Sequence, residues 1–301
     1  MSETLSTYQV PEHHVMQFTG NVQHALQKMP GLLMQHVTRG AYVGEKAQVV
    51  NFIGPVFFQK RTTKYSDTEV TEPEHTQRWI YGDEFDTAML VDRLDTLKMI
   101  YEPTNMYVEA FRVGAARKQD DIIMEAFFAV AKAGKHGNTN VSFPAADTIA
   151  NGGTRMSVAK LRAARKRLKL NHVDLRMTRP LIAVTAHQID DLLGEVAVGS
   201  SDYNAVKPLV DGEVNAFMGF TFVPYEDQDA VTKGIPTNVG GTVRYCPVWV
   251  PEGMHYGSWQ ELVITINNRA DKNNIKQIHG TFTAGATRRE EGRVLMLECV
   301  E

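Results

Sequence analysis

Three pairs of adjacent carboxylates are the residues whose type best suits acid–base catalysis. They are Asp120–Asp121, Asp190–Asp191 and Glu290–Glu291. Neighbouring residues on a helix point about 100° apart, whereas side chains three or four residues apart meet on one face. The first two pairs therefore do not converge on one substrate atom. We expect all three pairs to be solvated or salt-bridged surface residues.

Histidines provide the residue type for metal binding but not the spacing. His13, His14, His24 and His36 match no rigid helical or hairpin metal site, and no cysteine or acidic cluster nearby completes one. No stretch fits a phosphate-binding loop, and no serine or cysteine lies in a nucleophile elbow. The sequence therefore predicts no catalytic, cofactor-binding or metal-ligating residue, and no enzyme.

The densest basic cluster lies in the segment SVAKLRAARKRLKL. Its members are Arg162, Arg165, Lys166, Arg167 and Lys169. Basic residues on one helix are suited to contact phosphates, but no aromatic residue is interleaved to stack bases. We therefore favour the interpretation that they form the solvent-exposed face of an amphipathic helix. A non-specific contact with DNA is compatible with both interpretations.

Composition places the chain among globular proteins. Its 301 residues are 43% hydrophobic, which is enough for one large domain or two ordinary ones. The net charge of -3 gives no global attraction to nucleic acid or to acidic membranes. Two cysteines, Cys246 and Cys299, make no disulfide framework and indicate a reducing environment. No signal peptide or membrane-spanning segment is predicted.

A long hairpin is predicted in the first third of the chain. The run QVVNFIGPVFFQ is a strand by composition, bent at Gly54 and Pro55. The polar segment KRTTKYSDTEVTEPEHTQ follows, and RWIYGDEFDTAMLVD then resumes a strand pattern. Loops of this length inside a compact domain tend to be functional.

Three helices follow. The first begins near Pro103, ends near Gly134 and needs packing along its whole length. The second begins at Ser157. The third, TAHQIDDLLG, has the capping-box spacing of Thr185 and Gln188 and is expected to stop at Gly194.

The chain closes with strands. NAFMGFTFVP and VRYCPVWV precede three more, LVITIN, IKQIHGTFTA and RVLMLECV, which we expect to form a terminal sheet. A turn of mixed charge precedes the last strand, which we expect to be covered on both sides.

This order of elements resembles that of the tailed-bacteriophage major capsid proteins. The blocks that carry the resemblance are RWIYGDEFDTAMLVDRLDTLKMIYEPTNMYVEAFRVGAARKQDDIIMEAFF, SSDYNAVKPLVDGEVNAFMGFTFV and NRADKNNIKQIHGTFTAGATRREEGRV. The resemblance covers roughly residues 47–301 and implies an α+β, HK-ninety-seven-like fold. The implied parts are an N-terminal arm (1–46), an extended β-hairpin loop (47–90), a peripheral domain with a long spine helix (91–154), an axial α/β domain (155–261) and the peripheral domain's terminal β-sheet (262–301).

The resemblance also implies a function. The chain would assemble as hexamers and pentamers into the icosahedral head of a tailed bacteriophage, in the host bacterial cytoplasm, around double-stranded DNA. Its expected partners are itself, a separate scaffolding protein, a portal, and decoration or cement proteins, with no membrane. A cellular nanocompartment shell of the same fold is the alternative, and a soluble enzyme is a distant third. No covalent cross-link between subunits is expected.

Charge and exposure suggest where such a chain meets its neighbours. The inter-subunit contact candidates are Phe57, Phe58, Arg61, Glu69, Glu72, Arg288, Arg289, Glu290 and Glu291. Curvature of a shell needs hinges, for which Gly54, Gly82 and Gly134 are candidates. The DNA-facing candidates are the five basic residues of the 157–170 segment.

Overall fold

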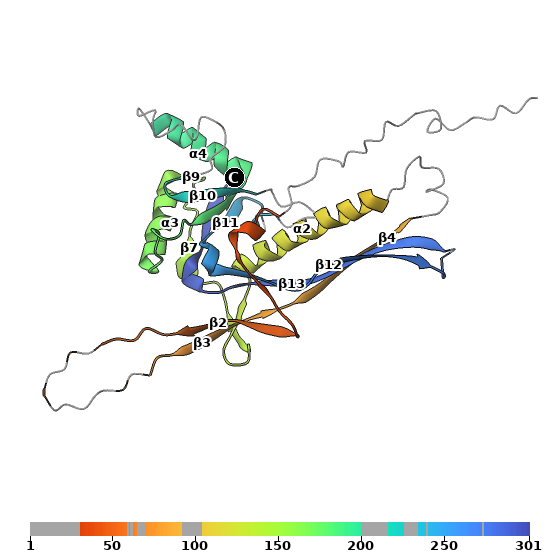
Figure 1. Ribbon diagram of the computed structural model, residues 1–301. Coiled ribbons are helices and arrows are strands. Elements are labelled where there is room, and N and C mark those ends of the chain that lie inside the picture. Colours follow the sequence, from red (N-terminus) through yellow and green to blue (C-terminus); the bar gives the residue numbers. More distant parts are fainter. Residues whose placement is uncertain are drawn as a thin grey trace, which may run out of the picture.

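The computed structural model describes residues 31–58, 60, 63–64, 70, 72–91, 104–199, 216–225, 234–238, 240–272 and 274–301. A compact body occupies one end of the molecule, and two long projections leave it in different directions (Figure 1). One projection is a hairpin. The other is a long sheet with a helix lying along it.

A six-stranded sheet forms the centre of the body. Its spatial order is β7 (Thr148–Ile149), β14 (Val294–Val300), β11 (Val243–Trp249), β8 (Leu181–Val184), β10 (Phe220–Pro224) and β9 (Ala216–Phe217). All four residues of β8 are buried, as expected for a central strand. Helices α3 (Val158–Leu170) and α4 (Ala186–Gly199) belong to the same body.

A second sheet builds the long projection. Its order is β1 (Thr38–Ala41), β12 (Met254–Arg269), β13 (Ile275–Arg288) and β4 (Asp83–Val91). Helix α2 (Thr104–Phe128) lies along it and spans about 37 Å at about 1.5 Å per residue. The C-terminal half of α2 enters the body, where Phe127 packs on Trp249 with ring centroids 4.8 Å apart. The helix thus joins the long sheet to the core.

A third, smaller sheet carries the hairpin. Its order is β2 (Lys46–Ile53), β3 (His75–Tyr81), β5 (Ala131–Ala133) and β6 (Thr139–Val141). The short 3-10 helices are η2 (Met34–His36), η3 (Ala145–Asp147), η5 (Pro251–Gly253) and η6 (Glu291–Arg293). The chain passes directly from β3 in this sheet to β4 in the long sheet.

Both helix starts predicted from capping residues are confirmed. The Ser157 hydroxyl accepts the N–H of Lys160 at the start of α3. At the start of α4, the Gln188 side-chain oxygen accepts the backbone N–H of Thr185 at 3.0 Å, which is the reciprocal half of a capping box.

Two predicted helix ends and one predicted sheet are wrong. Helix α2 ends at Phe128 rather than near Gly134, which instead forms the β5–β6 turn with φ of +83°. Helix α4 continues through Gly194 to Gly199. Strand β14 does not join β12 and β13: it pairs with β11 over seven residues, so residues 262–301 do not form one terminal sheet.

The carboxylate pair at 120–121 is buried, contrary to our expectation of a surface pair. The Asp120 carboxylate accepts the backbone N–H groups of Gly31, Leu32 and Leu33 at 2.7, 3.0 and 3.1 Å. Burial raises the pKa of Asp120, against the effect of these hydrogen bonds. The carboxylate therefore fastens the chain before η2 to the middle of α2.

A buried histidine fastens the next part of the chain. His255 on β12 lies beside Thr38 of the parallel strand β1, and its Nδ1 is 2.9 Å from the Thr38 hydroxyl. That hydroxyl donates to the Met254 carbonyl at 2.5 Å, so it accepts from Nδ1–H. Nε2, 2.8 Å from the Tyr42 hydroxyl, is then the acceptor. The neutral ring thus has both nitrogens satisfied, and it holds residues 38–42 of the predicted arm against β12.

Acid should weaken this attachment. Burial lowers the pKa of His255 to about 4, below its ordinary 6.5. The unfolded chain therefore binds a proton at this histidine more readily than the folded chain does. Neutral His255 contributes fully to the free energy of unfolding above pH 6.5, and this contribution of about 3 kcal/mol is lost as the pH falls toward 4. Urea unfolding of subunits at a series of pH values should therefore show a steeper acid loss for the native chain than for His255→Gln. The exposed His136→Gln control should behave like the native chain, and equal slopes for all three would contradict the role of His255.

Candidate assembly surfaces

The hairpin carries bare apolar side chains beyond the end of β2. Phe57 is 72% exposed and Phe58 is 100% exposed, and Val56 and Val70 are exposed too. Glu72 is also exposed, whereas Arg61 and Glu69 lie outside the described residues. Isolated surface apolar residues are common, but two adjacent phenylalanines on a projecting segment indicate a surface that another molecule covers.

The root of the hairpin is tightly closed at two glycines. The Gly54 N–H donates to the Glu74 carbonyl at 2.7 Å and closes the base of the loop. Gly82 lies between β3 and β4, where a Cβ would come 2.7 Å from the Trp259 ring. Gly134 turns between β5 and β6. Their hinge role stays a prediction.

Strand β3 crosses the long sheet over a pair of glycines. Gly257 of β12 and Gly285 of β13 are register partners. A Cβ at Gly285 would overlap the carbonyl oxygen of Tyr81, and a Cβ at Gly257 would come 3.0 Å from the Ile80 side chain. Only glycine leaves room for this crossing, so the direction in which the hairpin departs is fixed by backbone contact.

The charged turn before β14 binds β3 at the crossing through contacts within the same subunit. Arg78 of β3 is buried, and its Nη2 is 2.6 Å from the Glu291 carboxylate, which is 23% exposed. Its Nε also donates to the Arg289 carbonyl at 3.3 Å. Glu291, expected at a subunit contact, therefore pairs within the subunit.

Arg288 was expected at a contact between subunits, but it is buried inside the subunit. Its side chain is 0% exposed, and its guanidinium donates to the carbonyls of Phe127 and Ala129 at the end of α2 and of Val141 in β6. Desolvation lowers its pKa to about 10, so it remains charged at neutral pH. Arg288 is a buried cap of α2 and no surface contact.

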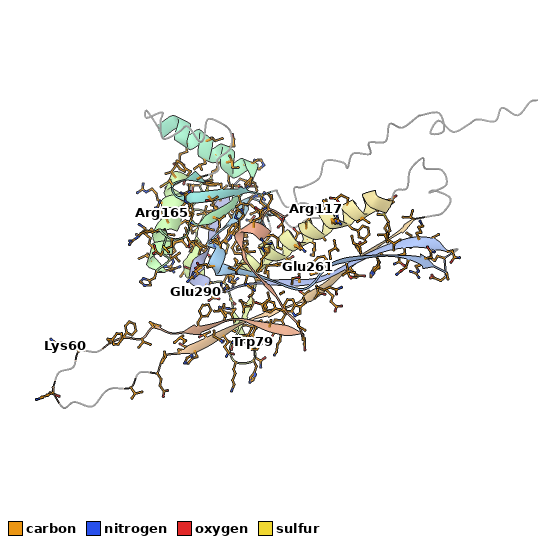
Figure 2. All side chains as sticks on the ribbon, in the orientation of Figure 1. Lys60, Trp79, Arg117, Arg165, Glu261 and Glu290 are labelled. Atoms are coloured by element: carbon orange, nitrogen blue, oxygen red, sulfur yellow. The ribbon has the colours of Figure 1, made fainter. Side chains whose placement is uncertain are left out.

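Glu290 and Arg289 remain nearer the surface. Glu290 is exposed and accepts a bond from Arg293 at 2.6 Å, and Arg293 also pairs with Glu252. Arg289 is half-buried. Figure 2 shows Glu290 on the side of the body that faces the hairpin root. These two residues stay candidates for contact with another subunit.

An apolar groove runs between α2 and β4. It has a volume of about 530 Å³, with Phe85, Phe111 and Phe282 among its lining residues. The Phe85 and Phe282 rings stack at 5.2 Å, and Phe111 covers Gly280. The remaining lining includes Leu262 and Met89, with Glu84, Asp86 and Lys118 as its charged members. β4 is the edge strand of its sheet.

The predicted basic residues of helix α3 fall into two groups: two are bonded within the fold and three are exposed. Arg165 donates to the Met218 carbonyl at 2.6 Å, and Arg167 pairs with Asp147 at 2.8 Å. Arg162, Lys166 and Lys169 are exposed. Leu161, Ala164 and Leu168 are buried on the opposite face, as the amphipathic pattern predicts. The five predicted residues are therefore not equivalent.

Comparison with known proteins decides the family. The family described as "Phage capsid protein" matches residues 10–301. The chain belongs to the phage capsid protein family. It is a phage major capsid protein, a structural component of the virion, and its α+β fold is the predicted HK-ninety-seven-like fold.

Solved capsid structures share this fold at low sequence identity. The capsid protein of Helicobacter pylori bacteriophage KHP40 is 8% identical with a TM-score of 0.71, over 99% of each chain. That of a native GTA particle is 11% identical with a TM-score of 0.70, over 100% of each chain. That of cyanophage P-SCSP1u is 14% identical with a TM-score of 0.68, over 94% of this chain and 92% of that one. No curated protein matches the sequence.

Within the described part of the chain, no helix is long and apolar enough to span a membrane. Cys246 and Cys299 are both buried. Asp191, from the second carboxylate pair, forms the predicted surface ion pair, with Arg155 at 3.1 Å. His13, His14 and His24 lie outside the described residues.

Sequence reasoning missed the residues that hold this capsid protein's parts together. Arg78, Asp120 and His255 are buried polar residues whose partners are far away in the sequence. Asp120 lies 87 positions from Leu33, Arg78 lies 213 positions from Glu291, and His255 lies 217 positions from Thr38. The one available signal was a charged residue inside an apolar strand, as in QRWIY, where Arg78 sits between strand residues. A buried charge requires a partner, and the sequence does not say which.

The two glutamates of the turn should respond differently to charge reversal. Glu291→Lys places a cation beside the buried Arg78, and should lower the free energy of unfolding by about 2–4 kcal/mol after allowance for the partial exposure of Glu291. Glu290→Lys breaks only an exposed pair and should cost less than about 1 kcal/mol. Chemical denaturation of the two variants measures the difference. Equal stabilities would show that the Arg78–Glu291 pair does not hold the crossing.

Proposed function

We propose that this capsid protein self-assembles as hexamers and pentamers into the icosahedral head of a tailed bacteriophage and encloses double-stranded DNA. The observation that supports this best is the bare pair Phe57–Phe58 on the projecting loop of a hairpin whose base is closed. Burying each ring would contribute about 1.5–3 kcal/mol. Within a shell, such modest contacts are repeated by every copy and combine through many neighbours.

The hairpin end and the α2–β4 groove are candidates for the two sides of one contact. Figure 2 shows Lys60 at the far end of the hairpin, on the other side of the molecule from Arg117 on α2. Because a rigid chain cannot bring this tip to its own groove, the groove would receive the tip of a second copy. A contact between two different surfaces of identical subunits is heterologous, and it closes into rings when the rotation permits.

Charge supports the same pairing. The charged residues of the groove are Glu84, Asp86 and Lys118, so its carboxylates outnumber its one cation. Lys60 and Lys64 follow the two phenylalanines on the hairpin. Opposite charges around an apolar contact select the partner and fix its register more than they add affinity. The floor of the groove is aromatic, so it offers the phenylalanine rings an apolar surface on which to be buried.

The wider proposal follows the family resemblance. The protein would assemble in the host bacterial cytoplasm with a separate scaffolding protein, a portal, and decoration or cement proteins. Negative-stain microscopy of the purified chain, with and without scaffolding protein, tests it. Closed particles are expected with scaffolding protein, and only small oligomers under both conditions would contradict the proposal. Particles that form without scaffolding protein and capture a cargo peptide would favour the nanocompartment alternative.

Removing the two rings should abolish assembly without unfolding the subunit. Phe57→Ser with Phe58→Ser changes exposed side chains, so the melting temperature of the subunit should shift by less than about 2 °C, whereas the yield of particles should fall at least about tenfold. Sedimentation velocity measures the amounts of free subunit and of assembled particles. Val43→Ser is the matched control, because Val43 is 97% exposed but lies outside the hairpin tip. Normal particles from the double variant would contradict the proposed contact.

A designed disulfide tests the groove as the receiving surface. In the variant Phe58→Cys with Met89→Cys, oxidation of assembled particles should link neighbouring subunits into ladders on non-reducing gels. Both native cysteines are buried and should give no background. Phe58→Cys paired with Lys272→Cys, an exposed position outside the groove, is the control. Particles that form normally but give no ladder with Met89→Cys would exclude this groove while leaving the shell function intact.

A further inference from the structure

An exposed strip of basic residues on α3 takes no part in the shell contacts proposed above. It consists of Arg162, Lys166 and Lys169. Positions i, i+4 and i+7 lie within one narrow arc of a helix, so these three cations share a face. Among the described residues, none of the three has an ion-pair partner, whereas Arg165 and Arg167 are bonded within the fold.

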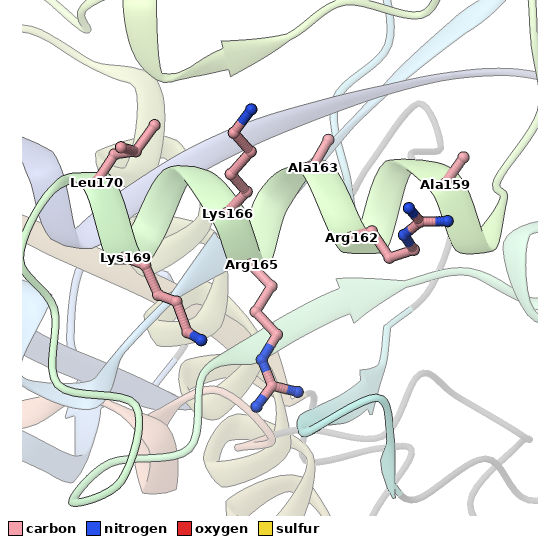
Figure 3. Close-up of a pocket in the computed structure, with 7 residues that line it drawn as sticks. All are labelled: Ala159, Arg162, Ala163, Arg165, Lys166, Lys169 and Leu170. Atoms are coloured by element: carbon pink, nitrogen blue, oxygen red, sulfur yellow. The ribbon is translucent and has the colours of Figure 1, made fainter.

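The strip borders an open depression. Figure 3 shows the three cations with Ala159, Ala163, Arg165 and Leu170, which together line a depression of about 750 Å³. The small alanines leave the charged ends as the most prominent features. From Arg162 to Lys169 the helix advances about 10 Å, a length over which duplex DNA carries about six phosphates.

The chemistry of the strip suits phosphates and not bases. No aromatic residue occurs in α3, so there is no platform for base stacking. Phosphate contacts by arginine and lysine position a protein on a duplex without reading its sequence. Two carboxylates lie near the ends of α3. Glu195 accepts the Val158 N–H at 2.7 Å at the start of the helix. Asp174 lines a depression with Lys169 at the other end, where it pairs with Arg176 at 4.0 Å.

We propose that this strip is the lumen-facing surface of α3 and that it binds the phosphodiester backbone of packaged DNA through Arg162, Lys166 and Lys169. The inference rests on the proposed shell function and assigns the DNA contact to three of the five basic residues of the helix. Each subunit makes about three phosphate contacts, which is weak alone. Repetition over the inner surface makes the total binding strong, while each contact can still exchange.

The first test measures binding of a fluorescent DNA duplex by unassembled subunits over a range of salt. The native chain should show a slope of log affinity against log salt that is steeper by about 2.7 than that of the triple variant Arg162→Gln, Lys166→Gln, Lys169→Gln. The native affinity should therefore fall about 40-fold more than that of the variant between about 50 and 200 mM salt. A control that loses the same charge elsewhere is Arg39→Gln, Lys135→Gln, Lys272→Gln, all at exposed positions. The proposal would be overturned if the control variant lowered the salt slope as much as the triple variant does. It would also be overturned if native subunits did not bind the duplex at low salt.

The second test locates the strip in assembled particles. Ala163→Cys introduces the one accessible thiol expected within the described residues, because Cys246 and Cys299 are buried. A long polyethylene-glycol maleimide should label this variant as free subunits but not in intact DNA-filled particles. Labelling of intact particles would place α3 outside the shell, overturn the DNA contact and favour an acidic protein partner. Absence of any particles would instead contradict the proposed function, and the first test would remain informative.

Discussion

The crossing of β3 over Gly257 and Gly285 is the constraint on which the rest of the structure depends. The backbone at Tyr81 passes so close to β13 that no side chain fits beneath it. On one side of this point the chain belongs to the hairpin sheet, and on the other side it belongs to the long sheet. Any displacement of the crossing would therefore change the angle between the two projections of the molecule.

Buried charges turn this close approach into a rigid joint. Arg78 connects β3 to the turn before β14, and Arg288 connects the same turn to the end of α2 and to β6. Replacing such groups by apolar residues of the same shape can be tolerated, but removing one partner leaves a buried charge without compensation. The joint therefore gives a defined geometry, which a protein needs if each copy must present its hairpin to the next at the same angle.

The sequence predicted the parts better than their connections. Periodicity located α2, and the capping residues Thr185 and Gln188 located the start of α4, because these signals act within a few residues. The family resemblance then supplied the arrangement. The sheet chosen by β14, the burial of Asp120 and the inward direction of Arg288 were not predicted. Each depends on contacts between residues distant in sequence. Asp120 and Arg288 are charged, and charged residues usually lie on the surface, but here tertiary packing buries them.

The central claim is that a fixed joint aims the bare hairpin tip at a second copy. A cryo-electron microscopy map of assembled particles would test it most directly. We expect density for Phe57 and Phe58 of one subunit in the α2–β4 groove of its neighbour, with β3 crossing Gly285 as it does in the single chain. A map in which the tip points into solvent, or in which the crossing has opened, would contradict the claim.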